Sequence, residues 1–145
     1  MRKFPPGTAV RVGYRPPTSA EERVLRRLLG TQLPLADPSE ANAVVVYTTS
    51  WGARRVFPDM IVPTTKVAIE YDSPGPDQIA HGPWSVDTEK DRALRRVGWE
   101  VIRVRVGGLA LIGPYDVAAK GPTRGATAAV VTRYHRALLA RPWEE

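Results

Sequence analysis

The chain of 145 residues contains no cysteine and has no long hydrophobic run. Without cysteine, a disulfide framework, a thiolate zinc site and a thiol nucleophile are all excluded. No segment approaches the ~20 apolar residues that a membrane span needs, and no apolar run follows the charged stretch from Met1 to Gly7. We therefore expect a cytoplasmic protein that does not enter a membrane.

The charge is biased toward arginine. The 21 Lys and Arg residues against 15 Asp and Glu give a net charge of +6. Arginine suits bidentate contact with phosphate, and a basic surface speeds the encounter with nucleic acid. The same excess would also fit plain solubility or an arginine-biased genome. The length is typical of one domain, which we expect to cover residues 1–145.

Hydrophobic periodicity predicts alternating helices and strands. A helix should begin at Thr18 or Ser19 and end at Gly30, and a covered strand should follow at 43–47. Further elements are expected as a weak edge strand at 8–14, a hairpin of strands 55–62 and 66–72, a helix from Ser85 or Asp87 to 97, a strand at 99–106 and a helix at 126–141. This order predicts an α/β sandwich, with a small mixed central sheet flanked by helices.

Three carboxylates mark the predicted hairpin. Glu70 and Asp72 are two residues apart and share one face of a strand, while Asp59 can lie opposite on the neighbouring strand. Three neighbouring carboxylates would repel one another unless a cation bound between them, and hard oxygen ligands suit Mg²⁺ or Mn²⁺. The alternative is a hairpin face that points to water. The apolar run from 67 to 69 makes that alternative less favourable.

Other polar residues could serve the same chemistry. Lys90 could reach the carboxylates and position a water molecule or stabilise phosphate charge, or it could only pair with Asp87 on a wet helix face. His81, in the preceding loop, could act as an acid or base or simply be exposed. Glu22, or less favourably Glu21, could complete the site from the first helix or merely complement its dipole.

Three residues are candidates for contact with nucleic acid. Arg103 and Arg105 leave one side of the last core strand, near the expected cleft. Trp84 could stack on a base or anchor its loop.

The order of these motifs resembles a known family. The series consists of 67-VAIEYD-72, the loop with His81, Asp87-x-x-Lys90-Asp91-x-x-Leu94 and Gly98-Trp99-x-Val101-Ile102-Arg103. It is similar to the very-short-patch-repair-like branch of the PD-(D/E)XK nuclease superfamily, over about 19–106. The resemblance implies a restriction-endonuclease-like fold and a Mg²⁺-dependent or Mn²⁺-dependent DNA endonuclease of repair, restriction or mobile-element and phage biology.

The resemblance also implies residue roles. Asp59 would be the motif aspartate, Glu70 and Asp72 the E-x-D pair, and Glu22 the acid of the first helix. Asp72 stands where a typical member has lysine, so the basic role moves to Lys90 or His81. The alternatives are a catalytically silent DNA-binding or assembly module of the same fold, and a regulatory protein that never meets DNA. Many nucleases of this size dimerise, so a homodimer stays open.

Overall fold

The computed structural model describes residues 4–13, 19–50, 52–74 and 83–142, with only the backbone given for 83–85. In this part of the chain the helices are α1 (Ala20–Gly30), α3 (Pro83–Arg96) and α4 (Arg124–Leu139). The strands are β1 (Ala9–Val10), β2 (Ala43–Thr49), β3 (Gly52–Val56), β4 (Met60–Val62), β5 (Val67–Asp72), β6 (Glu100–Val106) and β7 (Val117–Ala119). None of the described helices has the length and apolar character needed to cross a membrane.

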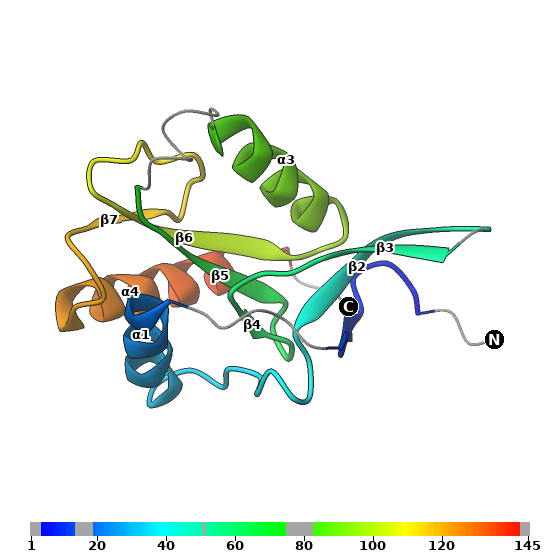
Figure 1. Cartoon of the computed structure of the whole chain (residues 1–145), viewed down its shortest axis with the longest axis horizontal. Coiled ribbons are helices and arrows are strands. Elements are labelled where there is room, and N and C mark those ends of the chain that lie inside the picture. The colour runs from blue at the N-terminus through cyan, green and yellow to red at the C-terminus, as the bar shows by residue number, and fades with distance from the viewer. Residues whose placement is uncertain (1–3, 14–18, 51, 75–82, 143–145) are drawn as a thin grey trace.

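The strands form two sheets (Figure 1). The smaller sheet is antiparallel, in the order β1-β2-β3. The larger sheet has the order β4-β5-β6-β7, with β4 antiparallel to β5 and the other neighbours parallel. The protein is therefore a mixed α/β structure, and the prediction of a small mixed sheet flanked by helices is confirmed at this level.

Alternation along β5 directs successive side chains to two different cores. Ile69 and Tyr71 belong to a core that includes Leu25 of α1 and Val130 of α4. Ala68 packs in a second core together with Leu94 of α3, Trp99, and Val44 and Val46 of β2. Because both faces are covered, every residue of β5 is buried, including Glu70 and Asp72. The second core also joins the two sheets.

The helix boundaries follow from their caps. The Ser19 hydroxyl accepts the backbone N–H of Glu22 at 3.1 Å, which confirms one of the two expected starts of α1. The final helix begins at Arg124, two residues earlier than expected, because the Thr123 hydroxyl caps it by accepting the N–H of Ala126 at 3.0 Å. Gly98, with φ of +87°, follows α3 as predicted.

The expectation of one strand over 55–62 is wrong. The chain instead leaves β3 at Val56 and enters β4, in the other sheet, at Met60. Pro58 has no N–H to give to a strand ladder, and the backbone N–H of Asp59 bonds to a side chain rather than to a neighbouring strand. The change of sheet places Asp59 beside β5. Two smaller differences are that β1 has only two residues and that β7 lies between the elements predicted at 99–106 and 126–141, where no strand was predicted.

Candidate functional site

Glu70 joins three segments of the chain under α3. One oxygen, Oε1, accepts the backbone N–H of Asp59 at 2.6 Å, and the other, Oε2, accepts the Lys90 ammonium at 2.7 Å. Lys90 Nζ also donates to the carbonyl of Phe57 at 3.1 Å. Glu70 is only 4% exposed, whereas the Lys90 side chain is 24% exposed. The loop before β4, strand β5 and helix α3 therefore meet at one carboxylate, near the surface.

Asp59 and Glu22 bring two more carboxyl groups to this point. Asp59 Oδ2 accepts the backbone N–H of Tyr71 at 2.8 Å, and its carbonyl accepts a bond from the Arg26 guanidinium. Glu22 is buried and forms a side-chain hydrogen bond with Asp59. We call the carboxyl groups of Glu22, Asp59 and Glu70, with the Lys90 ammonium, the acidic cluster.

Burial and mutual repulsion make these carboxyl groups weaker acids than usual. Burial, followed by the charge of Glu22, raises the pKa of Asp59 to about 6. Burial also raises the pKa of Glu70 to about 7; Asp59 adds to the rise, while Lys90 and Arg103 oppose it. The two carboxyl groups would therefore titrate nearer neutral pH than usual, mainly because they are buried.

Asp72 belongs to a second group, which we call the arginine network: Asp72, Asp87, Asp91, Arg103 and Arg105. The parallel register pairs Glu70 with Arg103 and Asp72 with Arg105, so all four side chains face α3. Asp72 Oδ2 lies 3.0 Å from Arg103 Nη1 and 2.9 Å from Arg105 Nη1. Helix α3 adds Asp91, 2.7 Å from Arg103 Nη2, and Asp87, 3.0 Å from Arg105 Nη1.

The expected three-carboxylate group of Asp59, Glu70 and Asp72 is interrupted by a guanidinium. Arg103 Nη1 lies 3.0 Å from Asp72 Oδ2 and 3.5 Å from Glu70 Oε2, so a fixed cation stands between the two acids of the E-x-D pair. Among the residues that the structure describes, no three His, Cys, Asp or Glu side chains are arranged to hold a metal ion. Glu22, rather than Asp72, is the third acid next to Asp59.

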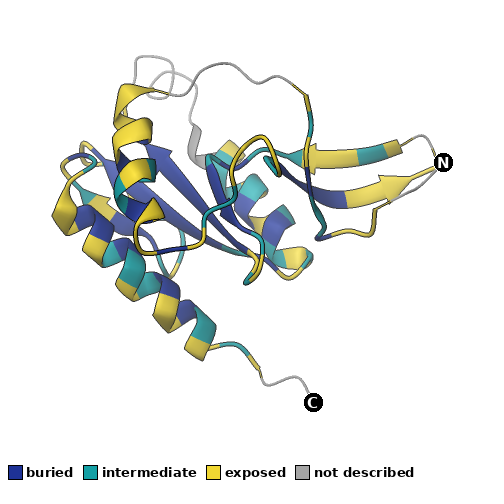
Figure 2. Cartoon of the chain, turned by 90° about the horizontal axis from the view of Figure 1, so that it is seen from below, coloured by how far each residue is buried: buried dark blue, intermediate teal, exposed yellow. Residues whose placement is uncertain are grey.

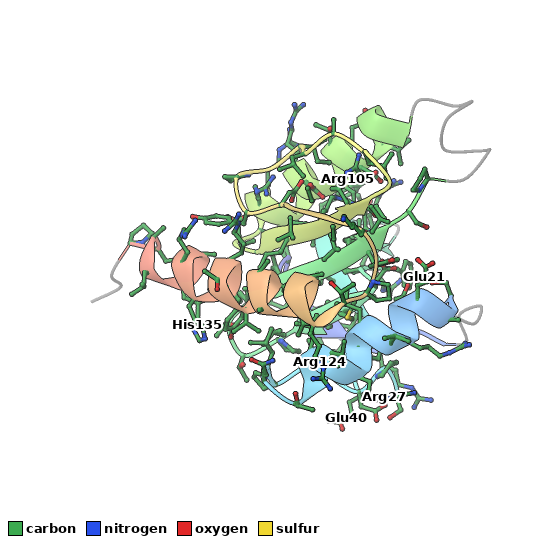
Figure 3. All side chains as sticks on the ribbon, turned by 90° about the vertical axis from the view of Figure 1, so that its left-hand side faces the viewer. Glu21, Arg27, Glu40, Arg105, Arg124 and His135 are labelled. Carbon is green, nitrogen blue, oxygen red and sulfur yellow. The ribbon has the colours of Figure 1, made fainter. Side chains whose placement is uncertain are left out.

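Arg103 and Arg105 lie inside the protein, contrary to the expectation that they project toward a nucleic acid. Their exposed fractions are 0% and 3%. Alternation did predict that they share a face, but α3 covers that face and three aspartates neutralise it. They therefore hold α3 against the sheet. Figure 3 labels Arg105 on this side and Glu21 at the start of α1.

The remaining candidates are placed as follows. Lys90 pairs with Glu70 and Asp87 with Arg105, so the alternative of an Asp87–Lys90 bridge is not what forms. His81 lies outside the described residues. The backbone of Trp84 is in the first turn of α3, and its side chain lies outside the described part.

Sequence reasoning missed two other polar anchors. The Tyr71 hydroxyl donates to Glu21 Oε2 at 2.6 Å, which ties β5 to the start of α1, and this bond with burial raises the pKa of Tyr71. Asp116 is buried and accepts the N–H groups of Arg103, Ile112 and Gly113 at 2.9–3.0 Å. The Gly-Pro sequence before Asp116 signalled a turn, but nothing in it indicated that the turn would be fastened to β6.

The donor chemistry of the acidic cluster fits a magnesium or manganese ion. Magnesium is commonly bound by one or two carboxylates and keeps several waters, so it does not need a closed protein cage. Asp59 and Glu70 are hard-oxygen donors in the same cluster, and a bound cation would favour their charged forms, which burial disfavours. Asp72 does not fit this role, because two arginines already neutralise it.

Comparison of the chain with models of protein families, with curated proteins and with solved structures found no significant match.

Proposed function

We propose that the protein is a metal-dependent DNA endonuclease of the PD-(D/E)XK, restriction-endonuclease-like kind, acting in repair, restriction or mobile-element and phage biology. The observation that carries the proposal is the Lys90 ammonium, 2.7 Å from Glu70 Oε2, with the backbone N–H of Asp59 donating to the other oxygen. This brings together two acids and a base, which is the set that such a nuclease requires. Here the lysine comes from a helix rather than from the strand position that Asp72 fills.

In the proposed reaction, Asp59 and Glu70 would hold Mg²⁺ or Mn²⁺, with Glu22 beside Asp59. The ion would polarise the phosphodiester and lower the pKa of a bound water molecule. Lys90 is partly exposed and is anchored by the Phe57 carbonyl, so its ammonium is available to a phosphate near Glu70. There it would offset the negative charge that develops in the transition state.

The arginine network would act only as support. Arg103 and Arg105 bind aspartates of α3, the helix that carries Lys90. They thereby position Lys90 relative to β5, but they are too deeply buried to contact DNA. We describe them as positioning residues.

A catalytically silent DNA-binding module is the second candidate, and one observation favours it. Both oxygens of Glu70 already accept hydrogen bonds, one from Asp59 and one from Lys90. An acid neutralised in this way can be stable without any metal ion. Under this alternative Lys90 is a substitute for the cation rather than a catalytic group.

A cleavage assay separates the two candidates. Supercoiled plasmid, mismatched duplex and branched DNA are incubated with wild type and with Glu70→Gln, in Mg²⁺, in Mn²⁺ and in chelator. The nuclease hypothesis expects wild type to cut at least one substrate with metal alone, and Glu70→Gln to cut none while still binding it. Absence of cutting by wild type on all substrates would favour the silent module.

A further inference from the structure

The outer half of the β2–β3 hairpin extends from the body of the protein as an arm. We define the arm as residues 47–50 and 52–55. All of them are exposed except the half-buried Ala53. Figures 1 and 2 show the hairpin reaching away from the helices and the larger sheet, with its exposed residues toward the tip. Its base, by contrast, is fixed, because Val44, Val45 and Val46 are buried.

The arm carries positive charge only. The sequence has no acidic residue between Glu40 and Asp59, whereas Arg54 and Arg55 are consecutive in β3. Both arginines are exposed, and within the described part of the chain neither forms an ion pair with a carboxylate. This contrasts with Arg103 and Arg105, whose charge is used inside the protein. The charge of the arm is thus available to an anionic partner.

The register arranges the side chains of the arm on both faces of the ribbon. Tyr47 pairs directly with Arg54, so these two share one face, and Tyr47 is 50% exposed. Arg55 pairs with Val45 and lies on the opposite face. The pairing shifts between Val45 and Tyr47, a bulge that increases the local twist of the hairpin. A twisted two-stranded ribbon with cations on both faces has the form of a strand pair that enters a major groove.

The arm leads directly into the acidic cluster. Only Val56, Phe57 and Pro58 separate the arm from Asp59. The Phe57 carbonyl is the group that accepts Lys90 Nζ. A polyanion lying along the arm would therefore be brought to the position where Lys90 and Glu70 meet.

We infer that this arm is a DNA-binding element, in which Arg54 and Arg55 bind the phosphates that flank the groove and Tyr47 contacts the sugar or base beside Arg54. The inference rests on the proposed function, since it assigns duplex DNA as the partner. It moves DNA contact from the buried Arg103 and Arg105 to the surface arginines of β3. Arginine forks bind phosphate oxygens bidentately, which fits this role.

A competing role for the same arginines is protection of an edge. Strand β3 lies at the edge of its sheet, and charged side chains on edge strands prevent pairing with other chains. Under that role, loss of the arginines would promote association of the protein with itself and would not specifically weaken DNA binding. Arg54→Lys/Arg55→Lys keeps the charge on the edge, so it should leave the association state of wild type unchanged under either role.

The test measures binding of a fluorescent DNA duplex by anisotropy in chelator, where no metal-dependent cleavage can occur. Arg54→Gln/Arg55→Gln is compared with Arg124→Gln/Arg136→Gln, a pair of exposed arginines on α4 whose loss changes the net charge equally. Figure 3 labels Arg124 at the start of α4, across the larger sheet from α3. Size-exclusion chromatography of every variant reports self-association.

We expect the arm variant to bind about tenfold more weakly or worse, and to lower the salt slope of binding by about 2, with losses below about threefold in the α4 variant. Arg54→Lys/Arg55→Lys should retain most of the affinity, and Tyr47→Ala should lose a few-fold. Equal losses in the arm and α4 variants, or no DNA binding by wild type, would overturn the inference. So would self-association of the arm variant if the lysine variant bound DNA as weakly as Arg54→Gln/Arg55→Gln does.

The outcome is separate from that of the cleavage assay. If wild type cuts DNA but the arm and α4 variants bind alike, the nuclease proposal stands and the arm inference fails. If wild type cuts nothing but the arm variant alone loses affinity, the arm inference stands and the protein is the silent module.

Discussion

The two charged groups under α3 contain the same number of carboxylates but differ in their cations. In the arginine network, every one of the three aspartates has a guanidinium nitrogen within 3.0 Å, although burial raises the pKa of Asp91 there too. In the acidic cluster, Glu70 lies 2.7 Å from the Lys90 ammonium and 3.5 Å from Arg103 Nη1, and the pKa values of Asp59 and Glu70 are raised to about 6 and about 7. Residues two apart on β5, Glu70 and Asp72, thus have opposite roles.

This difference indicates which acids serve stability and which could serve chemistry. A carboxylate that is already paired with arginines has no charge left for a ligand. A carboxylate with fewer cationic partners can bind a cation. The E-x-D pair is therefore divided: Glu70 faces the proposed reaction and Asp72 supports α3. Substitutions in each group test that division.

Arg103→Ala should be the most damaging single change. It leaves Asp72 and Asp91 buried without their shared partner, and breaking a buried ion pair costs about 3–5 kcal/mol. Urea denaturation should show this loss, while Arg92→Ala on the exposed side of α3 should change the free energy of unfolding by less than about 0.5 kcal/mol. A loss below about 1 kcal/mol for Arg103→Ala would show that the network is not structural.

Lys90→Ala should act on cleavage more than on the fold. If its ammonium stabilises the transition state, single-turnover cleavage should fall about 100-fold or more while DNA affinity stays within a few-fold. The stability loss should be about 1–2 kcal/mol at pH 8, because Glu70 then keeps a buried charge, and smaller at pH 5, where Glu70 is protonated. Unchanged cleavage would return Lys90 to a purely structural role.

The free energy of unfolding should depend on pH through the acidic cluster. The pKa values of Asp59 and Glu70 are higher in the folded state than in the unfolded chain, so the folded protein binds protons more tightly. Their contribution is fully present below about pH 4, decreases as the pH rises above that value, and is lost once the pH has passed about 6 and 7, a decrease on the order of 6 kcal/mol.

Denaturation curves from pH 4 to 8 would measure this decrease. Asp59→Asn and Glu70→Gln should flatten the pH dependence, and Mg²⁺ should restore stability at pH 8 in wild type but not in these variants. Asp72→Asn is the matched comparison: it should reduce stability at all of these pH values. If Glu70→Gln and wild type showed the same dependence of stability on pH, the raised pKa of Glu70 would be contradicted.

The sequence predicted the elements that carry the site better than it predicted their neutralisation. The apolar run at 67–69 and the glycine after α3 predicted β5, β6 and the helix between them nearly in place. Alternation also put Arg103 and Arg105 on one face, but it cannot tell whether a helix covers that face. That question depends on Asp87 and Asp91, which look like ordinary acids of a wet helix until α3 is docked.

The break between β3 and β4 was missed for a similar reason. The run from Arg55 to Val62 has strand propensity throughout, apart from Pro58. What ends the strand is a tertiary contact, the bond from the Asp59 N–H to Glu70. Predictions from local pattern could place Asp59 near Glu70, but not as the residue where the chain changes sheet. That residues 1–145 form a single domain stays a prediction. That the protein forms a homodimer also stays a prediction.

The smallest effects should come from removing one of two helix caps. Ser19→Ala and Thr123→Ala each remove a side-chain acceptor from the first turn of a helix, so each should cost about 1 kcal/mol of stability. Only Ser19 holds the backbone of an acidic-cluster residue, since its hydroxyl accepts the Glu22 N–H. We therefore expect Ser19→Ala to lower cleavage several-fold and to weaken the pH dependence of stability, with Thr123→Ala changing neither. Equal effects of the two caps on cleavage would mean that Glu22 takes no part in the acidic cluster's function, and that Asp59, Glu70 and Lys90 act without the first helix.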